Sequence, residues 1–555
     1  MIQKRKRMDV WGGTSILILV VYGLFLIYPL VRLLMESVTK DGQFTLDFFA
    51  KFFSNSYYGE TLLHSFLLSI SATLVSLVLG IPLAYLYNMY EIKGKNLIQI
   101  IIVLCCMSAP FIGAYAWVQL RGNNGIITQF IGRIFGVKPP SIYGFRGIVL
   151  VLALQLYPLV FMLVSGALKN VDSSLLEAAQ NMGVGGVRRF FKMIIPLCMP
   201  TILAAALLVF MRAFADYGTP LLIGRGYQTF PVIIYNEYFG ETGTDHNFAA
   251  AVSVIAIIIT AVIFLIQKWA SNRFAFNMNA LHPIQRKKAR GLKGILIHAY
   301  TYIIVFLAFM PQLYVMYCSF RKTSGKIFVD GFSMGSYEKV ARDLPLEIRN
   351  TFLIGLLALA AVVLLAILIA YLVVRRKSKL NDTIDTASMI PYIIPGSVVG
   401  IALVVAFNRQ PMVLTGTMLI MVIALCIRRI PYTIRSSVAV LQQIPITVEE
   451  AAISLGCSKM KAFFKATVPM MRNGILSGAI LSWVTIITEL STGVILYNRK
   501  TITLTLAIYA QVTRGSDGPA AALATILNVL TITSMLTITS MLIFLRVSKN
   551  KDISF

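Results

Sequence analysis

The chain has 555 residues, of which 57% are hydrophobic and 13% charged, and its mean hydropathy is +0.77. This composition excludes an ordinary soluble globular protein and places the chain among multi-span membrane proteins. The formal net charge of +27 raises the alternative of nucleic-acid binding. The basic residues lie between long apolar runs, so membrane topology explains them and no nucleic-acid partner is expected.

Segments long and apolar enough to cross a bilayer, which takes about 20 residues, occur throughout the chain. The first half contains six of them, at about 14–34, 62–88, 97–120, 147–169, 197–223 and 249–268. The second half contains six more, at about 294–318, 351–374, 384–408, 412–434, 472–496 and 521–546. The third span of each half carries prolines, at Pro110 or at Pro391 and Pro395, which are tolerated where neighbouring helices satisfy the freed backbone groups.

Lys and Arg gather in alternate connecting segments and indicate the orientation of the chain. With the N-terminus inside, the cytoplasmic segments all carry basic residues, around 4–7, 93–95, 188–192, 268–293, 375–379, 459–465 and 546–551. The sequence therefore predicts that both termini are cytoplasmic. Basic residues near 133–146 and 321–349 fall outside and are exceptions. The basic N-terminus resembles a signal peptide, but its apolar run is too long and lacks a cleavage site, so we interpret it as the first span.

One stretch of sequence occurs twice. Residues 177–183 read Glu-Ala-Ala-Gln-Asn-Met-Gly, and residues 450–456 read Glu-Ala-Ala-Ile-Ser-Leu-Gly, 273 positions further on. The same spacing relates Phe-Phe-Lys at 190–192 and 463–465, and Pro196 and Pro469. Including positions upstream, ten identities fall within about forty residues, whereas unrelated segments agree at roughly one position in fifteen. We therefore predict an all-α polytopic membrane protein with about 12 transmembrane helices in two homologous six-helix halves.

The repeated stretch resembles the EAA loop of bacterial ABC importer permeases, in which a Gly follows the Glu by six residues and a Pro follows about thirteen later. The resemblance implies cytoplasmic loops near 177–196 and 450–469, each with a short coupling helix that docks on an ATPase subunit. It also implies a fused permease, with halves at 1–272 and 294–555 and a basic cytoplasmic linker at 273–293. A short amphipathic helix without a partner is the alternative for either copy alone.

The expected coupling residues are Glu177, Ala178, Ala179 and Gly183 in the first copy, and Glu450, Ala451, Ala452 and Gly456 in the second. A glutamate in the first turn of a short helix interacts favourably with the helix dipole. Two alanines favour the helix and let another surface approach closely. The glycine ends the helix or opens a turn.

The chain contains no Gly-x-x-x-x-Gly-Lys-Ser/Thr motif, which binds the phosphates of ATP in P-loop ATPases. We therefore predict a transport subunit that is not an enzyme and holds no cofactor. In that case ATP and Mg²⁺ are bound by a separate ATPase. Six cysteines show neither disulfide nor metal-ligand spacing. One acidic group has side chains of the kind that bind metals: Glu237, Glu241, Asp245 and His246. A solvated outer loop is the favoured interpretation, and no metal is expected.

Charged residues within predicted spans are costly and need an explanation. Asp216 and Glu489 are again 273 positions apart, in the fifth and eleventh spans, and in the family these helices line the central pathway. Two interpretations stay open. The carboxylates face the translocation pathway, or they hold neighbouring helices together and pair with an arginine. Arg428 and Arg429, which have no basic counterpart in the first half, are expected to pair with a carboxylate or to extend toward the membrane surface.

Four further motifs narrow the resemblance to the fused permeases of ferric-iron importers, over nearly the whole chain. They are Asp-Tyr-Gly-Thr-Pro at 216–220, Pro-Gly at 395–396, Arg-Arg-Ile-Pro-Tyr at 428–432 and Glu-Leu-Ser-Thr at 489–492. The resemblance implies a bacterial inner-membrane protein that works with two ABC ATPase subunits, an external substrate-binding protein and membrane lipid. Permeases for thiamine, polyamines, phosphonates or sugar phosphates share most of these motifs and remain alternatives.

A different class, the ion-coupled secondary transporter, also has twelve spans in two halves. It would use Asp216 and Glu489 for ion coupling and would need no ATPase. The duplicated Glu-Ala-Ala loops argue against this class. A membrane enzyme has little support, because the chain has only four histidines, scattered, and no arrangement of a nucleophile with a base.

Overall fold

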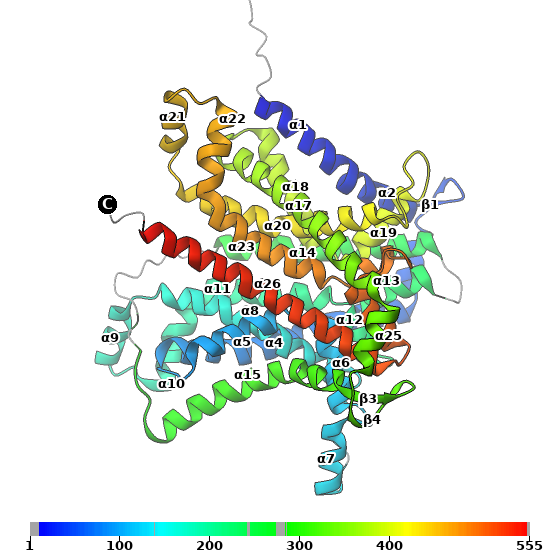
Figure 1. Cartoon of the computed structure of the whole chain (residues 1–555), viewed down its shortest axis with the longest axis vertical. Helices are drawn as coiled ribbons and strands as arrows, with labels where there is room; N and C mark the ends of the chain where they lie inside the picture. Colours follow the sequence, from blue (N-terminus) through cyan, green and yellow to red (C-terminus); the bar gives the residue numbers. More distant parts are fainter. Residues whose placement is uncertain (1–9, 138, 241–244, 274–283, 285, 552–555) are drawn as a thin grey trace, which may run out of the picture. The chain divides into compact units, whose positions relative to one another are not determined.

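The computed structural model describes residues 10–137, 139–240, 245–273, 284 and 286–551 (Figure 1). Within these residues the only sheets are two pairs of short strands, β1 (Thr39–Lys40) with β2 (Gln43–Phe44) and β3 (Arg321–Ser324) with β4 (Ile327–Phe332). Helices form the rest of the regular structure. The predicted all-α architecture is confirmed.

The chain folds into two compact units. The first-repeat unit comprises Phe49–Thr244 and Ile255–Arg321, and the second-repeat unit comprises Met1–Phe48, Asp245–Val254 and Lys322–Phe555. Each unit contains one of the two Glu-Ala-Ala loops. The unit boundaries fall within α3 (Asp47–Ser54), just before and within α14 (His246–Arg273), and within β3.

The other helices of the first-repeat unit are α4 (Ser56–Met89), α5 (Lys95–Met107), α6 (Pro110–Arg121), α7 (Ile126–Phe135), α8 (Phe145–Lys169), α9 (Ser173–Asn181), α10 (Gly186–Arg189), α11 (Ile195–Phe214), α12 (Gly218–Ile223), α13 (Phe230–Phe239) and α15 (Gly291–Ser319). A π-helical turn, Phe190–Ile194, joins α10 to α11.

The other helices of the second-repeat unit are α1 (Val10–Tyr22), α2 (Tyr28–Ser37), α16 (Gly335–Asp343), α17 (Pro345–Arg375), α18 (Lys379–Ile393), α19 (Gly396–Phe407), α20 (Met418–Gln443), α21 (Thr447–Ser454), α22 (Lys459–Ala462), α23 (Val468–Ile487), α24 (Gly493–Leu496), α25 (Leu504–Thr513) and α26 (Asp517–Lys551). π-Helical turns join α1 to α2 at Gly23–Ile27 and α22 to α23 at Phe463–Thr467.

Among the described residues, nine helices are long and apolar enough to span a membrane, and two bent pairs raise the number to eleven. The bent pairs are the predicted spans 97–120 and 384–408, which turn by 101° and 111° near Pro110 and Pro395. Proline at the first position of a helix, or just before it, ends the preceding helix. The remaining predicted span, 412–434, corresponds to the 26-residue helix α20, whose hydropathy is lowered by Arg428, Arg429 and Arg435.

Small residues bring the long helices of each unit close together. In the first-repeat unit α4 packs on α8, and a Cβ added to Gly80 would lie 2.7 Å from Val160 Cβ. In the second-repeat unit α20 packs on α23, and a Cβ on Gly478 would lie 2.6 Å from Thr433 Cα. Because lipid tails are as apolar as leucine, close backbone packing of this kind stabilises helix association in a membrane.

The first predicted span of each half packs with the helices of the other half. α1 contacts α17 and α18, and α2 contacts α19, all of them in the second-repeat unit. α15 contacts α4, α5 and α6 in the first-repeat unit, along which it runs in Figure 1. The compact units therefore differ from the predicted sequence halves 1–272 and 294–555. Most of the predicted linker 273–293 lies outside the described residues.

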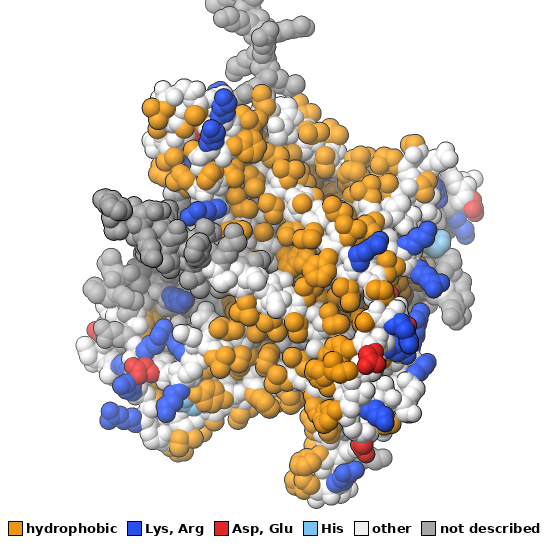
Figure 2. Space-filling view, in the orientation of Figure 1, with side chains coloured by type: hydrophobic (Ala, Val, Ile, Leu, Met, Phe, Trp, Pro, Cys, Tyr) orange, Lys and Arg blue, Asp and Glu red, His pale blue; other side chains and the backbone are white. Residues whose placement is uncertain are grey.

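The surface of α15 has the character of a lipid-facing helix. Its exposed side chains include Ile295, Leu296, Ile303 and Phe306, each more than half exposed. Figure 2 shows hydrophobic side chains along this helix, with Lys and Arg where it begins. This distribution fits a helix whose middle contacts the hydrocarbon core and whose start lies at the polar membrane surface.

Candidate functional site

The two Glu-Ala-Ala loops share one local structure. α9 carries the first copy and α21 carries the second, and each helix ends in a glycine with positive φ, +78° at Gly183 and +91° at Gly456. The N–H of Gly183 donates to the Gln180 carbonyl at 3.0 Å, and the N–H of Val184 donates to the Ala179 carbonyl at 2.9 Å. This pair of bonds is a Schellman motif, which glycine favours because it has no Cβ.

The second copy repeats both bonds. The N–H of Gly456 donates to Ile453 at 2.9 Å, and that of Cys457 donates to Ala452 at 3.1 Å. Gly183 and Gly456 therefore end their helices, as predicted. Sequence spacing and backbone hydrogen bonding describe the same duplication.

The predicted place of the glutamate in the first helical turn holds for one copy only. Glu450 lies in the first turn of α21. Glu177 lies beyond the first turn of α9, so the prediction for this residue is wrong. The helix starts earlier than the motif. The N–H of Ser174 donates to the Asp172 carboxylate at 2.9 Å, and this cap begins α9 at Ser173.

Both loops present an exposed surface with apolar side chains. The side chains of Glu177, Ala178, Glu450 and Ala451 are exposed, whereas Ala179 is buried and Ala452 half-buried. The residue before each glycine is a large apolar side chain in the open, Met182 with 75% and Leu455 with 88% of its surface exposed. Phe191 and Phe464, at matching positions further on, are also exposed. Large apolar side chains are thus exposed at matching positions of the two loops.

Each loop continues into one long helix. α10, its π-helical turn and α11 form a single 29-residue helix, Gly186–Phe214, and α22, its turn and α23 form another, Lys459–Ile487. At 1.5 Å per residue each helix is about 40 Å long, enough to cross the hydrocarbon core. A displacement at a Glu-Ala-Ala loop is therefore applied to one end of a membrane-crossing helix.

The opposite end of each long helix breaks at a carboxylate. Asp216 follows α11, and its Oδ2 accepts a 3.0 Å hydrogen bond from the Thr219 N–H at the start of α12. Glu489 follows α23, and its Oε1 accepts a 3.1 Å bond from the Thr492 N–H before α24. These residues correspond pairwise, so the duplicated carboxylates perform the same capping of a helix break.

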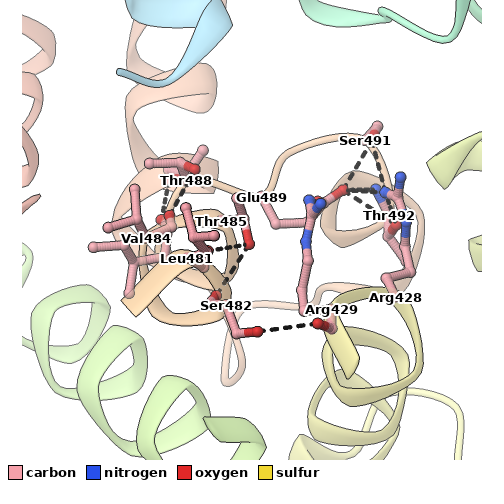
Figure 3. A network of polar contacts seen from close by, with 12 residues as sticks. Arg428, Arg429, Leu481, Ser482, Val484, Thr485, Thr488, Glu489, Ser491 and Thr492 are labelled. Atoms are coloured by element: carbon pink, nitrogen blue, oxygen red, sulfur yellow. Dashed lines mark hydrogen bonds and ion pairs between the residues drawn. The ribbon is translucent and has the colours of Figure 1, made fainter. Parts of the chain in front are cut away.

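In the second-repeat unit the capping carboxylate also pairs with two arginines (Figure 3). Arg428 Nη1 lies 2.6 Å from Glu489 Oε1, and Arg429 contacts the other carboxylate oxygen. Ser491 donates to Glu489 at 2.8 Å, and Arg428 donates to Thr492 Oγ1 at the same distance. The Glu489 side chain is 3% exposed, so this network joins α20 to the break after α23 inside the protein.

Gly396 lies against the same network. A Cβ on Gly396 would lie 2.2 Å from Arg428 Nη1 and from Ser491 Oγ, so only glycine fits at this position without displacing its neighbours. The bend between α18 and α19 is therefore packed against the ion pair. Of the two interpretations for the carboxylates within spans, pairing with an arginine is what Glu489 shows. Whether Asp216 and Glu489 face the translocation pathway stays a prediction.

The arginine pair has no counterpart in the first half. The positions 273 residues before Arg428 and Arg429 are Gln155 and Leu156. The first-repeat unit therefore keeps the backbone cap at Asp216 without guanidinium groups at the matching positions.

Sequence reasoning missed the tyrosines that hold the loops. Tyr85 near the end of α4 contacts Phe190 with ring centroids 5.0 Å apart, and Tyr371 near the end of α17 contacts Phe463 at 4.7 Å. Both tyrosines lie in an Ala-Tyr-Leu triplet, at 84–86 and 370–372. The repeated triplet could have pointed to these tyrosines. Its two copies are 286 residues apart, however, whereas the loops are 273 apart.

Among the described residues no three His, Cys, Asp or Glu side chains lie close enough to hold a metal ion. Of the acidic group weighed as a metal site, Glu237 accepts a 3.0 Å hydrogen bond from the Tyr58 hydroxyl, and Glu241 lies outside the described residues.

Membrane-crossing helices that link duplicated exposed loops to internal helix breaks define a transport permease. The chain belongs to the family of binding-protein-dependent transport system inner membrane components, which matches residues 54–276 and 362–547. The two matched regions each contain one Glu-Ala-Ala loop. The protein is thus a multi-span permease of the ABC importer class that carries both copies of the family unit in one chain.

Three relatives illustrate the range of this family. The ferric transport system permease protein of Actinobacillus pleuropneumoniae is 28% identical over 93% of this chain and 76% of its own length. A putative ferric transport system permease protein of Haemophilus influenzae is 26% identical over 86% of this chain and 76% of its own. The molybdenum transport system permease protein of H. influenzae is 31% identical over 37% of this chain and 90% of its own.

Proposed function

We propose that this permease imports ferric iron into the bacterial cytoplasm, driven by ATP that separate ATPase subunits hydrolyse. The duplicated loop, exposed and built the same way in both copies, is the observation that carries the proposal of two ATPase contacts. The iron assignment is supported by similarity to two ferric transport permeases over 93% and 86% of this chain and 76% of each relative. ATP and Mg²⁺ belong to the ATPase subunits, and an external binding protein delivers the iron.

The proposed mechanism is alternating access. The ATPase subunits close on ATP and move α9 and α21, and the exposed Met182 and Leu455 supply apolar contact at the two interfaces. Each movement is applied to a 29-residue helix, whose far end is the break at Asp216 or Glu489. A helix break is where the backbone can change direction, so the movement opens the pathway toward the binding protein. Hydrolysis of ATP then returns the helices to their starting positions.

The orientation follows from the same contacts. If α21 faces the ATPase, the start of α1 is cytoplasmic as well, because Trp11 packs against Phe463 in the same loop with ring centroids 5.0 Å apart. This geometry supports a cytoplasmic N-terminus, as the distribution of Lys and Arg does.

The test is uptake of radiolabelled ferric iron by bacterial cells that lack this chain. We expect the wild type to restore uptake and Glu177→Ala/Glu450→Ala to remain inactive at equal membrane abundance. Uptake of iron by the double variant would remove the coupling role of the two glutamates. If the wild type does not restore uptake, the assignment of iron as substrate is wrong. Molybdate and phosphonate are then the next substrates to measure, because relatives are named for molybdenum and for 2-aminoethylphosphonate. Absence of a co-purifying ATPase would overturn the ATP-driven mechanism itself.

A further inference from the structure

The second Glu-Ala-Ala loop is tied to the N-terminal helix by a buried aromatic cluster. Trp11 in the first turn of α1 contacts Tyr371 of α17 with ring centroids 4.4 Å apart, and Phe463 at 5.0 Å. Tyr371 and Phe463 contact each other at 4.7 Å. Trp11 is 3% exposed and the other two rings are fully buried. Three helices therefore meet in one closely packed group beside the loop.

A buried hydrogen bond joins this cluster to the coupling helix itself. The Tyr371 hydroxyl donates to Oε1 of Glu449, the residue that directly precedes Glu450. Glu449 is 7% exposed, and its second oxygen is buried without a hydrogen-bond partner in the described part of the chain. Burial of a carboxylate is costly unless hydrogen bonds compensate it, so the Tyr371 hydroxyl is a strong constraint on α21.

A second hydrogen bond fixes α1 against the same helices. Ser15 Oγ donates to Asn381 Oδ1 at 2.8 Å, and Asn381 Nδ2 donates to the Leu372 carbonyl at 3.3 Å. Ser15 is 2% exposed. Because these polar groups are buried, sliding of α1 along α17 would break hydrogen bonds inside the protein.

The first loop has the aromatic contact without the hydrogen bond. Leu176 occupies the position that corresponds to Glu449, so α9 offers no carboxylate there. Tyr85 and Phe190 keep the ring contact at 5.0 Å. Apolar contacts have no directional requirement and tolerate sliding, whereas a hydrogen bond to a carboxylate does not.

We propose that Glu449, Tyr371 and Trp11 are positioning residues that transmit movement of the second coupling helix to α17 and to the N-terminal helix. The inference rests on the proposed ATP-driven function. It makes the two ATPase contacts unequal, because the second loop carries α1 and α17 with it and the first loop acts mainly through its own long helix. Tyr371 links the three elements, since it contacts Trp11, Phe463 and Glu449.

The test uses the complete transporter, with its ATPase subunits and binding protein, in proteoliposomes. The readout is ferric iron transported per ATP hydrolysed, which a loss of stability alone does not change. Tyr371→Phe keeps the ring and removes the hydroxyl, and we expect this ratio to fall roughly five- to tenfold. Glu449→Leu, which installs the residue of the first loop, is expected to give the same fall. The matched control, Tyr85→Phe, is expected to keep the wild-type ratio.

Equal ratios for wild type, Tyr371→Phe and Glu449→Leu would overturn the inference while leaving the proposed function intact. An equal fall for Tyr85→Phe would also overturn it, because the two loops would then be equivalent. Absence of ATP-driven iron uptake by the wild type would overturn the proposed function and the inference together. Size-exclusion chromatography checks that each variant still forms the complete complex.

Discussion

The two repeats end their coupling helices in the same way, whereas their helix breaks share a cap and differ in ion pairing. Both loops end in a Schellman motif at a glycine, with the same two hydrogen bonds. Both breaks are capped by a carboxylate that accepts a threonine N–H. Only Glu489 pairs with Arg428 and Arg429, however, and the matching first-half positions hold Gln155 and Leu156.

This difference separates two tasks of the buried carboxylate. Capping the break is common to both repeats, so it is the part that the helix geometry requires. Among the described residues, we find an ion pair of the capping carboxylate at Glu489 only, so the pair is an addition that joins α20 to the break and packs on Gly396. Two guanidinium groups share one carboxylate, which makes the network sensitive to any loss of negative charge.

The largest expected effect comes from Glu489→Gln. The substitution leaves two partly buried guanidinium groups without their buried carboxylate, and breaking a buried pair costs about 3–5 kcal/mol. The measurement is the thermal or denaturant midpoint of the purified permease in detergent. A loss no larger than that of Asp216→Asn would contradict the distinction between the two breaks.

A double variant sharpens the same point. Arg429→Gln combined with Glu489→Gln removes one unpaired charge, and we expect recovery of roughly 1–3 kcal/mol relative to Glu489→Gln alone. Comparison of the two single variants with the double variant gives the coupling energy. Purely additive losses would show that Arg429 does not interact energetically with Glu489.

The coupling glycines are expected to respond alike. Gly183→Asp and Gly456→Asp each force a side chain into positive φ, at a cost of roughly 1–2 kcal/mol, and disturb the loop for which we propose contact with the ATPase. We expect transport to fall while the protein stays in the membrane. The control is Gly185→Asp, at an exposed position with φ of −114° and open space around it, which should transport normally. Unchanged uptake in Gly183→Asp or in Gly456→Asp would contradict the role of the glycine turn in transport.

The smallest expected effect is that of Asp216→Asn. The amide oxygen still accepts the Thr219 N–H, so the cap at the first break survives and stability changes by about 1 kcal/mol or less. Asp216→Ala removes the acceptor and should cost about 0.5–2 kcal/mol. Iron uptake measured on both variants then tests the pathway prediction, because a role for the charge itself would lower transport in Asp216→Asn without a loss of stability.

Local chemistry explains what the sequence could predict. Repeated spacing identified both loops, and the backbone freedom of glycine placed Gly183 and Gly456 at the helix ends. Apolar length identified the spans, but it gave no sign that the segments near Pro110 and Pro395 are each bent into two helices. The start of α9 was misplaced because the capping residue, Asp172, lies outside the repeated motif.

Contacts between distant residues were beyond prediction from the sequence. Glu449 and Tyr371 lie 78 residues apart, and no periodicity connects a carboxylate on a loop with a hydroxyl on a span. The pairing of Glu489 with Arg428 was one of two open interpretations, because composition shows the charges and only the fold brings them together. Resemblance to a family supplied the docking role of the loops, which no local pattern contains.

The exchange of first helices also sets an order of assembly. Ser15 and Asn381 are 366 residues apart, so α1 leaves the ribosome long before its hydrogen-bond partner is made. The surface that α15 covers on α4 and α5 likewise stays open until the second half of the chain begins. Neither bundle can close while the ribosome is still on the first repeat, so the packing of both bundles is completed only by helices made later.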